Sequence, residues 1–422
     1  MKYLYGIVML IFLTACSTKA PHGQFLKEFN TGYAGYAWEF KNNENQSIWQ
    51  SSISLVLDGH IDSHVKDVDY DAFEKLQDSI DDSKFIVMWF TKNWQEFYFN
   101  PELIQRAMDK GKIPVFLYWY FGDDFAVDNP TEVISKKHRA YMKMNQRIMK
   151  FLNKLNGEVV LLLEPEFNKQ HVLKNKENSE LFKAMMEYSL DYFRANAAKD
   201  LKLYLGLSMN DNGSKYKDEP FDLCGYEHCA LGDKYTWNKS VDILKSLSSR
   251  LDVVAFSLML SPFSRGSENP NIPQDYKNEK LGIGFLPQRI ANLSQYLYEQ
   301  LQKPVFLSHL VMASGAWEDT NQNQKIENSE VAANGWNQEI YETYANFDYG
   351  LFQKSGMFGL ALMNLFDNPK HDMGGYNYFL QNEHHLGLIS TGADAESLQP
   401  NDGRLRFKTY NGVDLIDLIY RD

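Results

Sequence analysis

The 422-residue chain has only three cysteines, no Gly-rich phosphate loop after an early strand, no sequence repeat and no long low-complexity linker. Its net charge of −12 provides no face that could neutralise phosphates, which argues against nucleic acid as a partner. Beyond the first residues, no apolar stretch suggests a membrane span. What is present is an ordinary 44% share of apolar residues, enough for a large core, and a high 14% share of aromatic residues.

The amino terminus has the order of a targeting segment. A positive start at Met1-Lys2 precedes an apolar stretch over 3–13 and a small-residue site that ends in Cys16. This resembles a bacterial lipoprotein signal, which implies a signal peptide over 1–15, lipidation of Cys16 and a tether over 16–30. Ser17 resembles the sorting pattern of outer-membrane lipoproteins, so we expect a lipid-anchored envelope protein. An ordinary signal peptide with a chance cysteine is the alternative.

The two remaining cysteines fit an exported protein. In an oxidising compartment, Cys224 and Cys229 are expected to form a disulfide that closes a small loop. A metal site made by both cysteines and His228 is the alternative, but the sequence offers no evident fourth ligand.

After the tether, short apolar runs alternate with longer segments of helical period. The eight runs expected to be strands are 52–58, 84–90, 113–120, 158–166, 201–209, 251–260, 303–312 and 357–366. Segments 137–155, 178–197, 238–249, 286–302 and 337–354 are expected to be helices, and Asn100-Pro101 is expected to begin another. Eight strand–helix units predict the α/β class and one (β/α)8 TIM barrel domain over 31–422. An open doubly wound sheet is the alternative.

The most informative stretch is 158–168, in which an apolar run ends in Glu164-Pro165-Glu166. Alternation along a strand places both carboxylates on one face. Two buried carboxylates are unfavourable unless a metal, a structural partner or acid–base chemistry uses them. Salt bridges or hydrogen bonds to loop amides are the structural alternative.

Polar and aromatic residues stand at most of the other expected strand ends, where barrel enzymes place their active sites. The candidates for substrate contact are Asp58, His60, Trp89, Tyr118, Tyr120, Asp124, Asn168, Asn210, His309, Trp317, Asn364 and Asp367.

With these motifs the chain resembles the (β/α)8 glycoside hydrolases. Many of them carry an acid/base Glu followed by Pro after the fourth strand, as Glu164-Pro165 is here, and enter the seventh strand through Lys-Pro, as Lys303-Pro304 does here. The stretches 363–369 and 383–388 are similar to the region that closes the sugar site in several of these families. The resemblance implies a glycosidase acting on a poly- or oligosaccharide, with no cofactor needed for the chemistry.

One departure limits the mechanism, because His309 stands where the resemblance implies a nucleophilic Glu. Retaining hydrolysis uses two carboxyl groups about 5–5.5 Å apart. Three alternatives stay open. The first resembles some barrel glycosidases of N-acetylated sugars, in which the substrate's acetamido group attacks in place of a protein nucleophile, with Glu166 as acid and Glu164 as its partner. The second is an inverting pair with Glu164 or Glu166 as acid and Asp58, Asp124 or Asp367 as base, and the third is a barrel that only binds glycan. A metal-dependent hydrolase or lyase using Asp58, His60 and Glu164 is a further alternative.

A polar segment after the seventh expected strand resembles the calcium loop of EF-hands. Oxygen ligands fall at positions 1, 3, 5, 9 and 12 of this loop, but Gln324 replaces the turn glycine at position 6. The resemblance implies a structural Ca²⁺ site, and a solvated loop is the alternative. The implied ligands are Asp319, Asn321, Asn323, Glu327 and Glu330.

Overall fold

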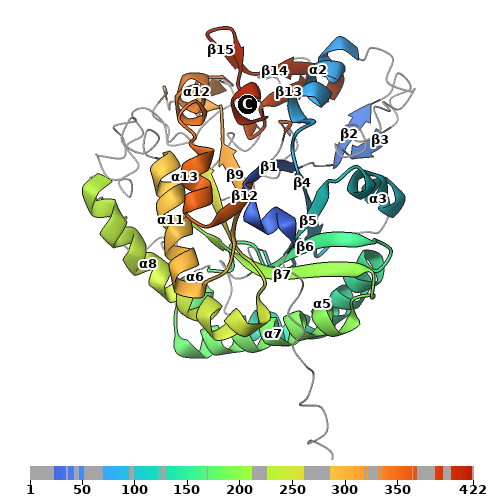
Figure 1. Cartoon of the computed structure of the whole chain (residues 1–422), viewed down its shortest axis with the longest axis vertical. Helices are drawn as coiled ribbons and strands as arrows, with labels where there is room; N and C mark the ends of the chain where they lie inside the picture. Colours follow the sequence, from blue (N-terminus) through green and yellow to red (C-terminus); the bar gives the residue numbers. More distant parts are fainter. Residues whose placement is uncertain are drawn as a thin grey trace, which may run out of the picture.

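Eight parallel strands close into a barrel in the computed structural model (Figure 1). The structure describes residues 23–34, 37–41, 47–51, 70–94, 99–122, 124, 130–168, 170–211, 226–260, 286–317, 320–321, 331–332, 334–363, 365–367, 385–392 and 401–420. Around the barrel the strands are β1 (Asn30–Ala34), β4 (Phe85–Thr91), β5 (Ile113–Trp119), β6 (Gly157–Leu163), β7 (Leu201–Asn210), β8 (Val254–Leu260), β9 (Val305–Met312) and β12 (Met357–Leu362). The predicted (β/α)8 barrel is confirmed.

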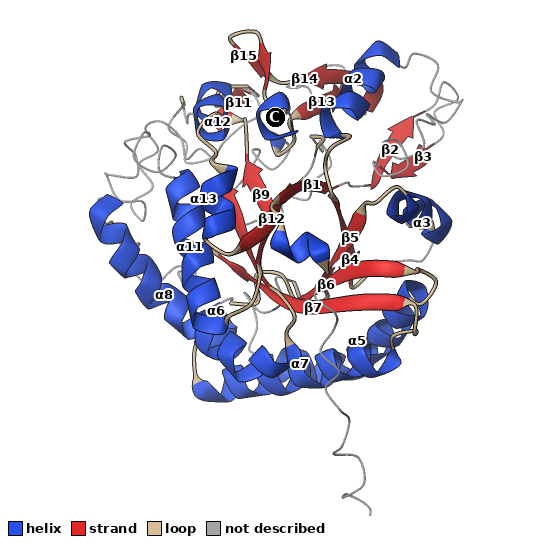
Figure 2. Cartoon of the chain, in the orientation of Figure 1, coloured by secondary structure: helices blue, strands red, loops and turns tan. Residues whose placement is uncertain are grey.

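Helices cover the outside of the strand ring (Figure 2). They are α2 (Tyr70–Ile80), α3 (Pro101–Asp109), α5 (Pro130–Leu152), α6 (Gln170–Leu173), α7 (Lys176–Asn196), α8 (Tyr226–Leu247), α11 (Leu286–Leu301), α12 (Asn337–Tyr344), α13 (Tyr349–Lys354) and α14 (Asp417–Tyr420), with 3-10 turns η1 (Gln24–Lys27) and η3 (Ser248–Arg250). Asn100 caps α3 as expected. The single helix expected over 337–354 is two, because Asp348 starts a new helix by accepting a hydrogen bond from Leu351 N at 2.9 Å. Within the described residues, no helix combines the length and apolar character needed to span a membrane.

Shorter strands form three further sheets. Four strands, β13 (Ile389–Gly392), β14 (Asn401–Phe407), β2 (Ala37–Lys41) and β3 (Ser47–Ser51), pair in that order, and two hairpins join β10 (Ala316–Trp317) to β11 (Val331–Ala332) and β15 (Thr409–Tyr410) to β16 (Val413–Asp414). Lys408, between β14 and β15, makes a buried ion pair at 2.6 Å with Asp367, which follows β12. Burial lowers the pKa of Lys408, and the adjacent Asp367 carboxylate opposes that shift. This pair joins the carboxyl-terminal strands to the barrel.

The first barrel strand differs from the sequence prediction. It is β1, which pairs with β4 and β12, and the expected strand over 52–58 lies outside the described residues. β1 is short and carries Asn, Thr and Gly, so its apolar signal is weak. Gly32 is required there because a Cβ at this position would lie 2.6 Å from the carbonyl oxygen of Phe85.

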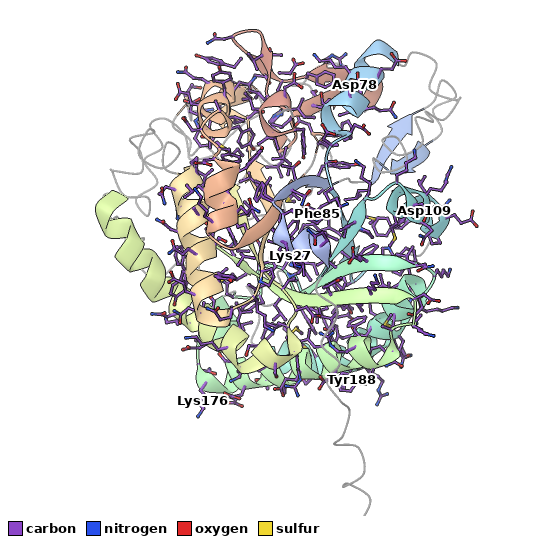
Figure 3. All side chains as sticks on the ribbon, viewed as in Figure 1. Lys27, Asp78, Phe85, Asp109, Lys176 and Tyr188 are labelled. Carbon is purple, nitrogen blue, oxygen red and sulfur yellow. The ribbon has the colours of Figure 1, made fainter. Side chains whose placement is uncertain are left out.

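Aromatic rings fill the amino end of the barrel. Phe25, in η1, is 4% exposed and makes edge contacts with Phe85, Tyr204 and Phe358 at centroid distances of 5.1–6.1 Å. Figure 3 places Phe85 at the centre of the strand ring, near Lys27 of η1. Residues 23–30, which the expected tether includes, therefore belong to the described fold.

Replacing Phe25 tests this assignment. Phe25→Ala should lower the free energy of unfolding by about 3–5 kcal/mol in a urea titration, because it opens a cavity at the barrel floor. Gln24→Ala, at an exposed side chain in the same turn, should change it by less than about 0.5 kcal/mol. Equal effects of the two substitutions would show that this segment is only a tether.

Candidate active site

The carboxyl ends of the strands form a polar and aromatic mouth. Trp89 of β4, Trp119 of β5, Asn210 of β7 and His309 of β9 stand there, and Glu166 follows β6. The rings of Trp89 and His309 lie 5.2 Å apart, and those of Trp89 and Trp119 lie 5.8 Å apart edge to face. The mouth therefore combines an aromatic wall with a carboxylate, an amide and an imidazole.

His309 faces the barrel interior because β9 contains a bulge. Between Leu307 and Leu310 the strand has one residue more than β12 has opposite it, and the register with β8 shifts at the same place. Leu307 and Leu310 both pack in the outer core, so Ser308 and His309 are consecutive residues that both point inward. A bulge of this kind redirects a side chain without ending the strand.

Of the two carboxyl groups at the end of β6, that of Glu166 reaches the mouth. Its side chain is 12% exposed, and its Oε1 accepts a hydrogen bond from Asn210 Nδ2 at 3.0 Å. The same oxygen lies 3.9 Å from Nε2 of His309, across the barrel from β6 to β9. The side chain of Asn168 holds this region in place. Its Oδ1 accepts a hydrogen bond from Asn210 N at 2.7 Å, and its Nδ2 donates one to the carbonyl oxygen of Asn210 at 2.9 Å.

Glu164 has a different environment. It is 2% exposed, and its two oxygens accept hydrogen bonds from the backbone N–H groups of Tyr120 and Phe121, at 3.3 and 3.2 Å. Burial raises the pKa of Glu164 to about 8, the two amide hydrogen bonds oppose that rise, and the charge of Asp124 adds to it. The Glu164 carboxyl therefore holds the loop after β5 in place. Hydrogen bonds to loop amides were the structural alternative to a catalytic role for this residue.

The expectation that Glu164 and Glu166 share one face is wrong. β6 ends at Leu163, so strand alternation does not extend to either residue. Both have left-handed backbone angles, with φ of 41° at Glu164 and 59° at Glu166. The chain turns between them and sends one carboxyl to the loop after β5 and the other to the mouth.

Two of the expected sugar contacts face away from the mouth. Tyr118 is fully buried outside the strand ring, where its hydroxyl donates to Asn145 of α5 at 2.8 Å and its ring stacks on Tyr141. Tyr120 packs against Tyr141 and Phe121. Both residues are core, which corrects their assignment as substrate contacts.

Two of the aspartates expected as a candidate base or substrate contact are held in ion pairs. Asp124 pairs with Lys137 and, at 3.7 Å, with Lys92. Asp367 is 8% exposed, pairs with Lys408 and accepts from Gly387 N at 2.9 Å. Each of these carboxylates is therefore held by at least one lysine.

Other predicted residues lie outside the described part of the chain. They are Cys16, Asp58, His60, Cys224, Asn364 and, in the expected calcium loop, Asp319, Asn323, Glu327 and Glu330. Asn321 of that loop is exposed, Trp317 lies in β10 and Cys229 lies in α8, the last two without a described side chain. Among described residues, no group of three or more His, Cys, Asp or Glu could hold a metal ion. The calcium site and the disulfide stay predictions.

Three residues of this region are not among the candidate substrate contacts: Trp119 at the mouth, and the buried Ser208 and Ser308 next to His309. Alternation already places Trp119 opposite Tyr118 and Tyr120, but the sequence does not say which face is inward. The buried position of Leu117 among the interior side chains settles that Trp119 is on the inner face. The bulge that turns Ser308 and His309 inward has no sequence signal.

The chain was compared with known proteins. No family model and no curated protein matches it. Similar solved structures include a family 1 β-glucosidase from Thermotoga maritima (11% identity, 89% of this chain, 95% of that one, TM-score 0.46), a β-glucosidase from Pyrococcus furiosus (12%, 90%, 93%, 0.44) and a β-glycosidase from Thermosphaera aggregans (12%, 94%, 95%, 0.44). At these identities the likeness concerns the fold alone, and at TM-scores below 0.5 it adds no argument about the site.

The raised pKa of Glu164 predicts a pH dependence of stability. The folded state holds this proton up to about pH 8, whereas the unfolded chain releases it near 4.5. Stability should therefore fall as pH rises between these values, by at most about 1.4 kcal/mol per pH unit. In urea titrations from pH 5 to 8, Glu164→Gln should remove this component, so its stability relative to wild type should rise with pH. Glu132→Gln, on the exposed face of α5, is the control, and parallel curves for wild type and Glu164→Gln would contradict the assignment.

Proposed function

We propose that the protein is a glycoside hydrolase that acts on a poly- or oligosaccharide at the barrel mouth. The observation that supports this best is the position of Glu166, whose carboxylate lies between Asn210 and His309 beside the aromatic wall. Trp89 and Trp119 offer ring faces and edges of the kind on which sugar rings pack, and Asn210 and Glu166 offer groups that bond to sugar hydroxyls.

In this proposal Glu166 is the general acid that protonates the leaving oxygen as the glycosidic bond breaks. Glu164 is not its partner at the reacting carbon, because its oxygens are used by the loop amides. The second group is then either the substrate's own acetamido oxygen or a carboxylate, such as Asp58, from outside the described residues.

A non-catalytic glycan-binding barrel is the second candidate function. It is favoured by His309, which stands in the seventh barrel strand where a retaining glycosidase would carry its nucleophile. A binding protein would use the same mouth for recognition but would show no turnover, so the variants of Glu166 separate the two functions.

Glu166→Gln should reduce turnover of a responsive aryl glycoside by about 10²- to 10⁴-fold, because Gln cannot donate the proton. That substrate should be sought in a panel of aryl glycosides that includes N-acetylhexosaminides, and binding of the glycan should be measured in parallel by calorimetry. Glu158→Gln is the matched control, since Glu158 lies on the same strand at the opposite end, bonded to Tyr204. Undiminished turnover in Glu166→Gln would exclude this acid, and binding without turnover in the wild type would favour the second function.

We also propose that Cys16 carries a lipid that anchors the protein to the bacterial envelope, in the outer membrane. The described chain begins at Gly23, next to the aromatic rings at the amino end of the barrel. Residues 17–22 span only about 20 Å when fully extended. The anchor would therefore hold the amino end toward the membrane, with the mouth on the opposite side, facing away.

Cys16→Ser should abolish incorporation of labelled fatty acid and release the protein from the membrane fraction, because only a thiol at this position can be lipidated. Cys229→Ser is the control and should remain labelled and membrane-bound. Labelling that persists in Cys16→Ser would contradict the anchor.

A further inference from the structure

A chain of buried hydroxyl groups lies beneath His309. Ser308 Oγ is 3.2 Å from His309 Nδ1, 2.8 Å from Ser208 Oγ and 3.1 Å from the carbonyl oxygen of Phe256. Ser208, Ser308 and His309 are all essentially unexposed, at 0–1%. These contacts must therefore be satisfied within the barrel.

The hydroxyl of Ser308 has one proton for these three contacts. The carbonyl of Phe256 can only accept, so Ser308 donates to it. The two lone pairs of Ser308 are then free to accept from Ser208 Oγ and from Nδ1 of His309. All three contacts are satisfied only when Nδ1 carries a proton, and in the neutral imidazole this leaves Nε2 with a lone pair.

That lone pair is directed at the site. Nε2 lies 3.9 Å from Glu166 Oε1, which is too far for a direct hydrogen bond. A water whose oxygen lies about 2.8 Å from each atom would fit between the two acceptors and could donate one hydrogen to each. Trp89 packs on the imidazole and limits its rotation.

We propose that His309 and Glu166 act as one acid–base unit that holds and deprotonates the water of hydrolysis. This rests on the proposed glycosidase function. In the first step Glu166 gives its proton to the leaving oxygen while the bond from C1 to that oxygen breaks and the substrate's acetamido oxygen bonds to C1. In the second step the water oxygen bonds to C1, the bond from C1 to the acetamido oxygen breaks, and the water proton passes to His309 Nε2 and on to Glu166.

The spacing favours this two-step course over inversion. An inverting pair is separated by about 6.5–9.5 Å, so that the sugar lies between the acid and the base. At 3.9 Å, Glu166 and His309 stand on the same side of the reacting carbon. Water would enter where the leaving group departed, which gives retention of configuration. Ser308 has a positioning role in this scheme, because it sets the tautomer of His309.

The tautomer can be measured without any substrate. Nitrogen-15 NMR of the histidine side chains, with His309 assigned through His309→Gln, should show Nδ1 as the protonated nitrogen. Ser308→Ala removes the acceptor and should shift the ring toward the Nε2–H form. Ser257→Ala, a buried inward-facing serine on β8, should leave it unchanged. An Nε2–H ring in the wild type would overturn the inference.

Kinetics test the role in hydrolysis. With a dinitrophenyl 2-acetamido-2-deoxyglycoside, whose leaving group needs no acid, His309→Gln should release the first equivalent of dinitrophenol normally but turn over about 10- to 100-fold more slowly. Azide, which attacks without a base, should restore the rate. Wild-type turnover in His309→Gln, or a loss that azide does not rescue, would overturn the proposal. A wild-type protein that hydrolyses no glycoside would instead refute the proposed function, and the NMR result would be unaffected.

Discussion

The interior of a closed eight-stranded barrel has to be filled, and the filling determines where polar groups can stand. At the amino end five aromatic rings, from Phe25, Phe85, Tyr204, Phe306 and Phe358, occupy the space. Aliphatic side chains follow above them, and the inward-facing polar atoms concentrate at the carboxyl end. Among the described residues these rings fill the floor, so the polar groups gather at the mouth, the end at which barrel enzymes bind their ligands. The two ends of the barrel, defined by its parallel strands, therefore differ in character: one is filled by aromatic rings and the other carries the polar groups.

The bulge in β9 links that packing to the chemistry of the mouth. In a regular strand, Ser308 and His309 would face opposite sides, and one of them would have to fit into the outer core between Leu307 and Leu310. The extra residue turns both inward, so that the hydroxyl lies below the imidazole and bonds to it. A local irregularity of the backbone thereby controls which nitrogen of His309 faces Glu166.

The elements predicted correctly from the sequence are those in which buried apolar residues recur along many positions. Seven barrel strands and the long helices have strong apolar periodicity, and the fold follows from their alternation. β1 was missed because its five residues are held by pairing with neighbours on both sides and need little apolar character. The sequence did not show that Tyr118 points out of the barrel and Trp119 into it, because alternation defines two faces of a strand but not which one is inside. The site was predicted only in part, because Glu166 and His309 meet through a turn and a bulge that no sequence pattern indicates.

The strand end at Glu164-Pro165-Glu166 shows how two neighbouring carboxyl groups come to differ. An unpaired charge in a buried strand end is unfavourable, and two such charges on one face would repel each other as well. The turn after Leu163 separates them. Glu164 enters a buried position where two backbone amides bind its oxygens and burial favours the protonated form. Glu166 keeps contact with the mouth, a donor amide and an imidazole. The positive φ angles at both residues are the conformational cost of this separation, and the separation leaves one carboxyl at the mouth.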